Sequence, residues 1–339
     1  MPPVRLGVLD VGSNTVHLLV VDALRGGHPT PMTSEKSELR LAEHLDRSGA
    51  LTRAGADALV RAVERARVSA EAAKCADLLA FATSALRDAT NSAAVLARVR
   101  SETGVALQVL PGDDEARYTF LAVRRWYGWS AGQLLVLDIG GGSLELATGK
   151  DEHPAAAASL PLGAGRLTRE WFSTDPPGRR EIDALRSHLD EQLAPVARRL
   201  RRQGRPDVAV GTSKTFRSLA RLTGAAPSGA GLRVRRSLTD TGLRQLASFI
   251  TRMSSADLAE LEGVSASRAH QLVAGALVAE AAMRALEITE LEICPWALRE
   301  GVILRRLDLL DGTAQTDRSA HDGPSALGPL TENQARCSG

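Results

Sequence analysis

The sequence predicts an α/β protein built from two similar halves. Apolar strand-like runs alternate with helical runs along the chain, which is typical of α/β architecture and not of a helical bundle. Two glycine-rich turns of one kind also recur far apart, at 6–15 and 134–143. The 339 residues, 44% of them hydrophobic, can bury a sizeable core, and this length suggests two domains.

The first half is expected to begin with a strand pair. Its expected elements are strands over 4–10, 15–22, 30–39, 76–82 and 105–110, and helices over 52–74, 91–103 and 112–127. Thr52 suits the N-cap of the long alanine-rich helix. Asn91 is expected to cap the next helix, which ends at Thr103 because Gly104 suits a left-handed residue after a helix.

The second half repeats this order of strands and helices. Its expected elements are strands over 133–138, 143–148, 155–161, 207–211 and 290–294, helices over 163–172, 178–203, 213–222 and 297–310, and a mostly helical stretch over 239–286. From about residue 311 the composition shifts to small and polar residues, which predicts a disordered tail. His321 and Asp322 lie in that tail, so they do not indicate a metal-dependent dyad.

Composition excludes several classes of protein. The three cysteines are odd in number and widely spaced, so they indicate neither a disulfide framework nor a metal cluster. The chain start lacks the charged and apolar regions of a secretory signal, and no apolar run is long enough to span a bilayer. A net charge of only +2 gives no overall basic excess for nucleic acid. We expect a cytoplasmic protein with neither a membrane nor a nucleic-acid partner.

The two turns carry the chemistry. Each follows an apolar strand that ends in one acid, Asp10 or Asp138, and its glycines let successive backbone N–H groups point into one anion-binding concavity. A carboxylate beside such a turn can hold a hard divalent cation whose other ligands are water and phosphate oxygens. The alternative is that each run is an ordinary buried strand ending in a tight turn that the acid caps.

Six ordered motifs carry a resemblance to a known family. They are Asp10-Val11-Gly12-Ser13-Asn14-Thr15 with His17, Ala82-Thr83-Ser84-Ala85-Leu86-Arg87 with Asn91, Gly112-Asp113-Asp114-Glu115-Ala116-Arg117, Asp138-Ile139-Gly140-Gly141-Gly142-Ser143 with Glu145, Val210-Gly211-Thr212-Ser213, and Leu298-Arg299-Glu300-Gly301. Over residues 4–311 the chain resembles the exopolyphosphatase and guanosine pentaphosphate phosphohydrolase (Ppx/GppA) family, of the actin, heat-shock ATPase and sugar kinase superfamily. In one departure, Asp114 stands where the family usually has a glutamate, which puts a role for that acid in doubt.

The resemblance implies two actin-like (ribonuclease H-like) domains with a cleft between them. The expected limits are 1–125 for the first domain, rejoined by the last helix over 297–311, 126–296 for the second, and 312–339 for the tail. It also implies a homodimer. Long members of the family carry an extra C-terminal helical region that helps to hold long chains, and this chain has no room for one. Short polyphosphates are therefore the expected preference.

The resemblance also assigns roles to single residues. Glu115 is the expected base that activates water, although an acid in a first helical turn is also favourable with the helix dipole alone. Phosphate is expected at Gly12, Ser13, Asn14, Arg87, Gly140, Gly141, Gly142, Ser143, Gly211, Thr212 and Ser213. Asp138 is the main expected ligand of Mg²⁺ or Mn²⁺, supported by Asp10 and Glu145. Glu145 could instead be an outward-facing strand residue.

The expected function is exopolyphosphatase activity that releases terminal orthophosphate from inorganic polyphosphate. One alternative is hydrolysis of the 5′ phosphate of guanosine pentaphosphate, which would link the protein to ppGpp metabolism. A kinase or ATPase of the same superfamily would also use Asp10 and Asp138, but the setting of Glu115 favours a hydrolase. A regulatory protein that binds polyphosphate without cutting it is the non-enzymatic alternative.

Overall fold

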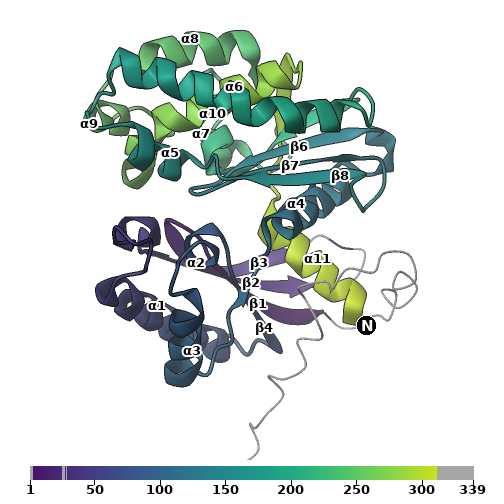
Figure 1. Cartoon of the computed structure of the whole chain (residues 1–339). Coiled ribbons are helices and arrows are strands. Elements are labelled where there is room, and N and C mark those ends of the chain that lie inside the picture. Colours follow the sequence, from purple (N-terminus) through teal and green to yellow (C-terminus); the bar gives the residue numbers. More distant parts are fainter. Residues whose placement is uncertain (1–2, 25–26, 28, 311–339) are drawn as a thin grey trace, which may run out of the picture. The chain divides into compact units, whose positions relative to one another are not determined.

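The computed structural model describes residues 3–24, 27 and 29–310 (Figure 1). By its contacts the chain forms two compact units: unit 1 runs to Asp114 and resumes at Val302, and unit 2 is Glu115–Gly301. Both junctions lie near the starts of helices, α4 (Gly112–Tyr127) and α11 (Leu298–Leu310). The domain boundary expected after residue 125 stays a prediction. The expected tail over 312–339, with His321 and Asp322, lies outside the described residues.

Unit 1 contains a five-stranded sheet in the order β3-β2-β1-β4-β5. The strands are β1 (Val4–Val11), β2 (Thr15–Ala23), β3 (Thr30–Glu38), β4 (Asp77–Ala82) and β5 (Gln108–Val109). The first three form an antiparallel meander, whereas β4 runs parallel to β1 and β5 runs parallel to β4. β1 lies between β2 and β4 and runs parallel to β4. The turn that follows β1 and the loop that follows β4 therefore lie at the same edge of the sheet.

Helices cover this sheet. They are η1 (Leu41–His44), α1 (Arg53–Ala72), α2 (Ser84–Arg87) and α3 (Ser92–Thr103). Helix α1 buries Leu59, Val63, Ala66 and Ala70, whose helical spacing gives one apolar face against the sheet core. Thr52 accepts a hydrogen bond from the Gly55 amide, so the predicted N-cap is confirmed.

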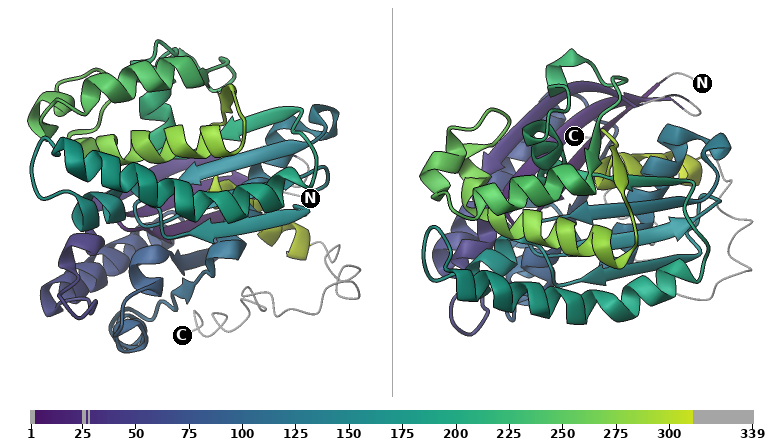
Figure 2. Two further views of the ribbon diagram at one scale, coloured as in Figure 1. Left: turned by 45° about the horizontal axis from the view of Figure 1, so that its top comes forward. Right: turned by 90° about the horizontal axis from the view of Figure 1, so that it is seen from above.

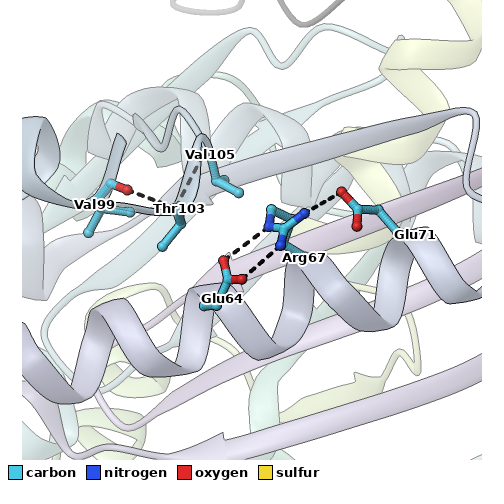
Figure 3. A network of polar contacts seen from close by, with 6 residues as sticks. All are labelled: Glu64, Arg67, Glu71, Val99, Thr103 and Val105. Carbon is cyan, nitrogen blue, oxygen red and sulfur yellow. Dashed lines mark hydrogen bonds and ion pairs between the residues drawn. The ribbon is translucent and has the colours of Figure 1, made fainter. Parts of the chain in front are cut away.

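Figure 3 shows polar contacts made by α1 and by the end of α3. On α1, Arg67 forms hydrogen-bonded ion pairs with Glu64 and Glu71, one turn away in each direction. At the end of α3, the Thr103 hydroxyl donates to the Val99 carbonyl and accepts from the Val105 amide. The partly exposed ion pairs add little stability, whereas the buried Thr103 contacts help to end the helix.

Unit 2 repeats the sheet of unit 1 and adds one strand. Its strands are β6 (Leu134–Ile139), β7 (Leu144–Gly149), β8 (Ala156–Leu160), β9 (Val208–Gly211), β10 (Ser237–Thr239) and β11 (Glu290–Ile293). The order β8-β7-β6-β9-β11 matches β3-β2-β1-β4-β5, both in the directions of the strands and in the order in which they follow one another along the chain. Strand β10 is added at the edge, next to β11. This confirms the prediction of two similar halves.

Among the described residues, unit 2 has more helices than unit 1. They are α5 (Ala164–Trp171), α6 (Arg179–Arg201), α7 (Ser213–Leu222), α8 (Asp240–Ile250), α9 (Ser255–Ala259) and α10 (Leu272–Ala285), with short turns η2 (Trp129–Ala131), η3 (Ser228–Ala230) and η4 (Ala266–Gln271). Both views of Figure 2 place α6 and α10 side by side. Helix α10 is apolar nearly all round and lies at the centre of the helical core.

Three local predictions need correction. The strand expected over 105–110 pairs only at Gln108–Val109, because Val105, Leu107 and Leu110 serve as core residues outside the ladder. Asn91 precedes α3 but does not cap it: its side-chain amide exchanges two hydrogen bonds with the Leu51 backbone. Strand β10 and helix α2 had no counterpart among the predicted elements. Among residues 3–24, 27 and 29–310, no helix is long and apolar enough to cross a membrane.

Candidate active site

The first turn lies in unit 1, between β1 and β2. Asp10 is opposite His17 in the β1–β2 pair, and the Gly12 amide closes the turn by donating to the Thr15 carbonyl at 2.9 Å. Ser13 and Asn14 are buried. Their carbonyls accept hydrogen bonds from backbone amides within 39–42, the segment that follows β3. The segment 39–42 therefore fixes one side of the turn through backbone hydrogen bonds.

The loop after β4 meets this turn. The Ser84 and Ser13 hydroxyls are hydrogen-bonded at 2.9 Å, and the Thr83 amide donates to the Val11 carbonyl. Arg87 is the last residue of the short helix α2, and its Nη1 donates to the Leu110 carbonyl at 3.3 Å. Unit 1 thus brings the predicted residues Ser13 and Arg87 to neighbouring segments. Ser84, which the motif contains but to which no role was assigned, ties those segments together.

The second turn lies in unit 2, between β6 and β7. Asp138 is directly opposite Glu145 in the β6–β7 pair, so both side chains stand on the same face of the sheet. The Gly140 amide closes the turn by donating to the Ser143 carbonyl at 2.9 Å, as Gly12 does with Thr15 in unit 1. The two turns therefore have the same local construction, each with one acid two residues before its first glycine.

Asp138 is half-buried, and its carboxyl group contacts a buried threonine. The Thr212 hydroxyl, itself fully buried, donates to Asp138 Oδ2. Burial raises the pKa of the Asp138 carboxyl, and this effect is opposed by the Thr212 hydrogen bond and by the positive charges of Arg217 and Arg268. A cation placed at Asp138 would offset the cost of keeping this carboxylate ionised.

The two neighbours of Thr212, Gly211 and Ser213, constrain the backbone around it. A Cβ on Gly211 would lie 2.9 Å from the Phe216 ring, so the close approach of α7 to β9 requires glycine there. Ser213 has a left-handed backbone with φ of 72°, which is costly for a residue other than glycine. The strained start of α7 thus lies beside Asp138.

Glu145 faces inward, so the reading of this residue as an outward-facing strand residue is wrong. It is buried and accepts a hydrogen bond from the Ser159 hydroxyl on β8 at 2.9 Å. Among the described residues, no three His, Cys, Asp or Glu side chains gather into a group that could hold a metal. The carboxylate pair Asp138 and Glu145 fits Mg²⁺ or Mn²⁺, because such ions accept one or two carboxylates and keep water and phosphate oxygens as other ligands.

Glu115 lies in the first turn of α4, as the sequence predicted. Its side chain is only 6% exposed, whereas Asp113 in the same turn is exposed. A buried acid in a first helical turn is not needed for helix stability, because the dipole interaction is available to an exposed acid as well. Its burial therefore distinguishes Glu115 from the neighbouring acids.

One groove in unit 2 lies away from all predicted site residues. It has a volume of about 580 Å³ and is lined by Arg201, Arg205, Asp207, Glu287, Glu290 and their neighbours. The lining includes the residues just before and at the start of β9, whereas Thr212 directly follows the end of that strand. Both cations and acids line this groove, so its charge does not favour a polyanion.

The sequence is similar to named proteins over nearly its whole length. It is 65% identical over 335 residues to Exopolyphosphatase 1 of Mycobacterium tuberculosis (strain ATCC 25618 / H37Rv), covering 98% of this chain and 97% of that protein. It is 64% identical over 319 residues to Exopolyphosphatase 1 of Mycobacterium leprae (strain TN), covering 94% of each.

Solved structures share the fold. The Aquifex aeolicus member of the Ppx/GppA family superposes with a TM-score of 0.77 at 25% identity, covering 91% of this chain and 99% of that one. An exopolyphosphatase from Cytophaga hutchinsonii superposes with a TM-score of 0.80 at 24% identity, covering 91% and 98%. Residues 20–310 match the Ppx/GppA phosphatase family. The chain therefore belongs to the Ppx/GppA phosphatase family, as its six motifs suggested.

Proposed function

We propose that the protein is an exopolyphosphatase that releases terminal orthophosphate from inorganic polyphosphate. The observation that carries this proposal is the 65% identity, over 98% of the chain, to proteins named Exopolyphosphatase 1. The paired turns support it, because backbone amides at glycine-rich turns bind phosphate groups without recognising a base or a sugar. Hydrolysis of guanosine pentaphosphate, kinase activity and mere binding are not favoured by these relatives.

Glu115 is our candidate general base. Hydrolysis of a terminal phosphoanhydride requires a water molecule in line with the leaving oxygen and a base that takes its proton. Burial of Glu115 is compatible with this role, since a carboxylate shielded from bulk solvent can hold a single water molecule. The leaving group is the shortened polyphosphate, and the transferred phosphoryl group becomes orthophosphate.

The turn residues would bind the negative charge of the phosphates. We assign this role to Gly12, Ser13 and Asn14 in unit 1, with Arg87 as a cation that can contact two phosphate oxygens. In unit 2 the same role falls to Gly140–Ser143 and to the segment 211–213. Each group would stabilise charge that spreads over the phosphoryl oxygens during transfer.

A divalent cation completes the proposal. Phosphatases of this family generally depend on divalent metals, and we propose Mg²⁺ or Mn²⁺ held by Asp138, with Asp10 and Glu145 in support. When bound, the ion would neutralise phosphate charge and polarise the bond to the leaving oxygen. The half-buried Asp138 and the buried Glu145, which lie opposite each other, supply the oxygen ligands that such ions prefer.

The proposal is tested by phosphate release from four substrates side by side: a short polyphosphate, a long polyphosphate, guanosine pentaphosphate and ATP. Each is assayed with Mg²⁺, with Mn²⁺ and with excess chelator, and light scattering on the same sample measures whether the protein is the expected homodimer. We expect metal-dependent release from polyphosphate with the highest kcat/KM. Faster release from guanosine pentaphosphate or ATP, or none from polyphosphate, would contradict the proposal.

A further inference from the structure

One segment donates hydrogen bonds to three successive carbonyl groups of the second turn, those of Gly140, Gly141 and Gly142. The Ala164 amide donates to the Gly140 carbonyl at 3.0 Å, and the Arg166 amide donates to the Gly141 carbonyl at 2.8 Å. The Arg166 side chain supplies the third bond, from Nε to the Gly142 carbonyl at 3.0 Å. The start of α5 therefore fixes three successive peptide groups, and Arg166 fixes two of them.

Two glycines make this close approach possible. A Cβ on Gly163 would lie 2.3 Å from the Gly142 carbonyl carbon and from the Ser143 nitrogen, which is far inside contact distance. A Cβ on Gly165 would lie 3.0 Å from the Gly141 carbonyl oxygen. Backbone atoms cannot move aside as a flexible side chain can, so the segment 163–166 is fitted to the turn by its shape as well as by its hydrogen bonds.

The orientation of the carbonyls determines where the amides point. In a planar trans peptide the C=O and the N–H of the next residue point in opposite directions. Since the carbonyls of 140–142 face the start of α5, the N–H groups of Gly141, Gly142 and Ser143 point away from it. Within the described part of the chain these three amides have no hydrogen-bond acceptor. Such adjacent free N–H groups form an anion-binding concavity.

We propose that Arg166 is a positioning residue that orients the amides of Gly142 and Ser143 toward a substrate phosphate. It acts through the carbonyls of Gly141 and Gly142. The side-chain bond is charge-assisted and therefore stronger than a bond between neutral groups. Glu170, at 3.7 Å from Nη1, is too distant for a hydrogen bond that would compete with the turn. This inference rests on the proposed binding of polyphosphate by the turn.

The test compares Arg166→Gln with Arg169→Gln in the full chain. Arg169 lies on the same helix and is exposed, and its Nη1 donates to the Gly165 carbonyl within that helix at 3.1 Å. Loss of a charged hydrogen bond predicts a roughly tenfold or larger rise in KM for polyphosphate in Arg166→Gln and no change in Arg169→Gln. Arg166→Lys retains a charged donor, so we expect it to recover part of the loss.

A second readout separates positioning from direct contact with the substrate. Hydrogen exchange of the peptide containing 140–143 is measured with saturating imidodiphosphate, a non-hydrolysable analogue. If Arg166 positions the amides, Arg166→Gln gives less protection at saturation than the wild type, whereas loss of a mere substrate contact leaves protection at saturation unchanged.

Two results would overturn the inference: an unchanged KM in Arg166→Gln, or equal protection of 140–143 at saturation. Either result leaves the proposed function standing, provided that the wild type and Arg169→Gln release phosphate from polyphosphate. If neither of these releases phosphate, the proposed function fails instead. If Arg166→Gln does not fold, the comparison is made with Arg166→Lys, for which a KM and protection equal to those of the wild type refute the inference.

Discussion

Asp138 is held in an environment that opposes its own charge. Its carboxylate accepts a hydrogen bond from Thr212 and is attracted by Arg217 and Arg268, yet burial still raises its pKa. Arg217 itself is only partly satisfied: its Nη2 donates to the Pro295 carbonyl at 3.3 Å, and its buried Nε has no acceptor among the described residues. Asp138 and Arg217 therefore lower the stability of the unliganded fold, and a bound cation or phosphate would supply the interactions they lack.

We predict that Asp138→Asn raises the melting temperature of the metal-free protein while it removes most phosphate release. A buried acid with a raised pKa destabilises the folded state at every pH above that pKa, and this cost disappears below the pKa of the unfolded chain. Asn removes the charge and can still accept the Thr212 hydrogen bond. Thermal unfolding at pH 7 with chelator measures the effect, for which we expect a rise of a few degrees.

Asp46→Asn provides a control of opposite sign. The Ser48 hydroxyl and the amides of Ser48 and Ala50 hold the pKa of Asp46 below its usual range, so its charge stabilises the fold. This variant should melt at a lower temperature and keep its activity. A lower melting temperature for Asp138→Asn would contradict our account of the buried charge.

At the scale of elements, the sequence predicts the two hairpins well because their signals are local. Apolar residues ending in one acid and a glycine-rich turn are enough to place Asp10 and Asp138, and most helices follow from capping and periodicity. Asn91 shows where local rules fail, since its side chain bonds to Leu51, forty residues earlier in the chain. The positioning of a turn by Arg166 likewise depends on packing, and the spacing of Gly163 and Gly165 was its only local signal.

The start of α6 gives a pH-dependent prediction. Glu181 accepts hydrogen bonds from the Ser173 hydroxyl and amide and from the Gly178 amide, and these bonds lower the pKa of its carboxyl, the Ser173 hydroxyl most strongly. A lowered pKa stabilises the fold above the pKa of the unfolded chain, and this stability is lost as the pH falls through the folded pKa. Glu181→Gln should therefore melt earlier than the wild type at pH 7, and the difference should close toward pH 3.

Thermal unfolding of both proteins between pH 7 and pH 3 makes this measurement. Asp183→Asn is the matched control on the same helix, because Asp183 is exposed and, among residues 3–24, 27 and 29–310, its one ion-pair partner is Arg179 at 3.9 Å. It should follow the wild type at each pH. A melting difference for Glu181→Gln that stays constant over this range would contradict the assignment of stability to the carboxylate charge.

At the scale of the whole molecule, duplication of one sheet explains why two distant motifs look alike. Each half places an antiparallel hairpin beside a parallel strand, and each parallel strand leads into a threonine, Thr83 or Thr212, that precedes a helix. The sequence could predict this repetition and the acids within it. It could not predict which face of each turn is open, because that depends on segments that reach the turn only after folding.

The proposed function depends on Glu115, which we propose activates the water that cleaves polyphosphate. The most direct test measures kcat for phosphate release and the affinity for imidodiphosphate in Glu115→Gln, with Asp113→Asn as the control from the same helical turn. The account predicts a fall in kcat of roughly 10² to 10⁴-fold for Glu115→Gln with nearly unchanged affinity, and no change for Asp113→Asn. A Glu115→Gln variant that binds the analogue and releases phosphate at the wild-type rate would contradict it.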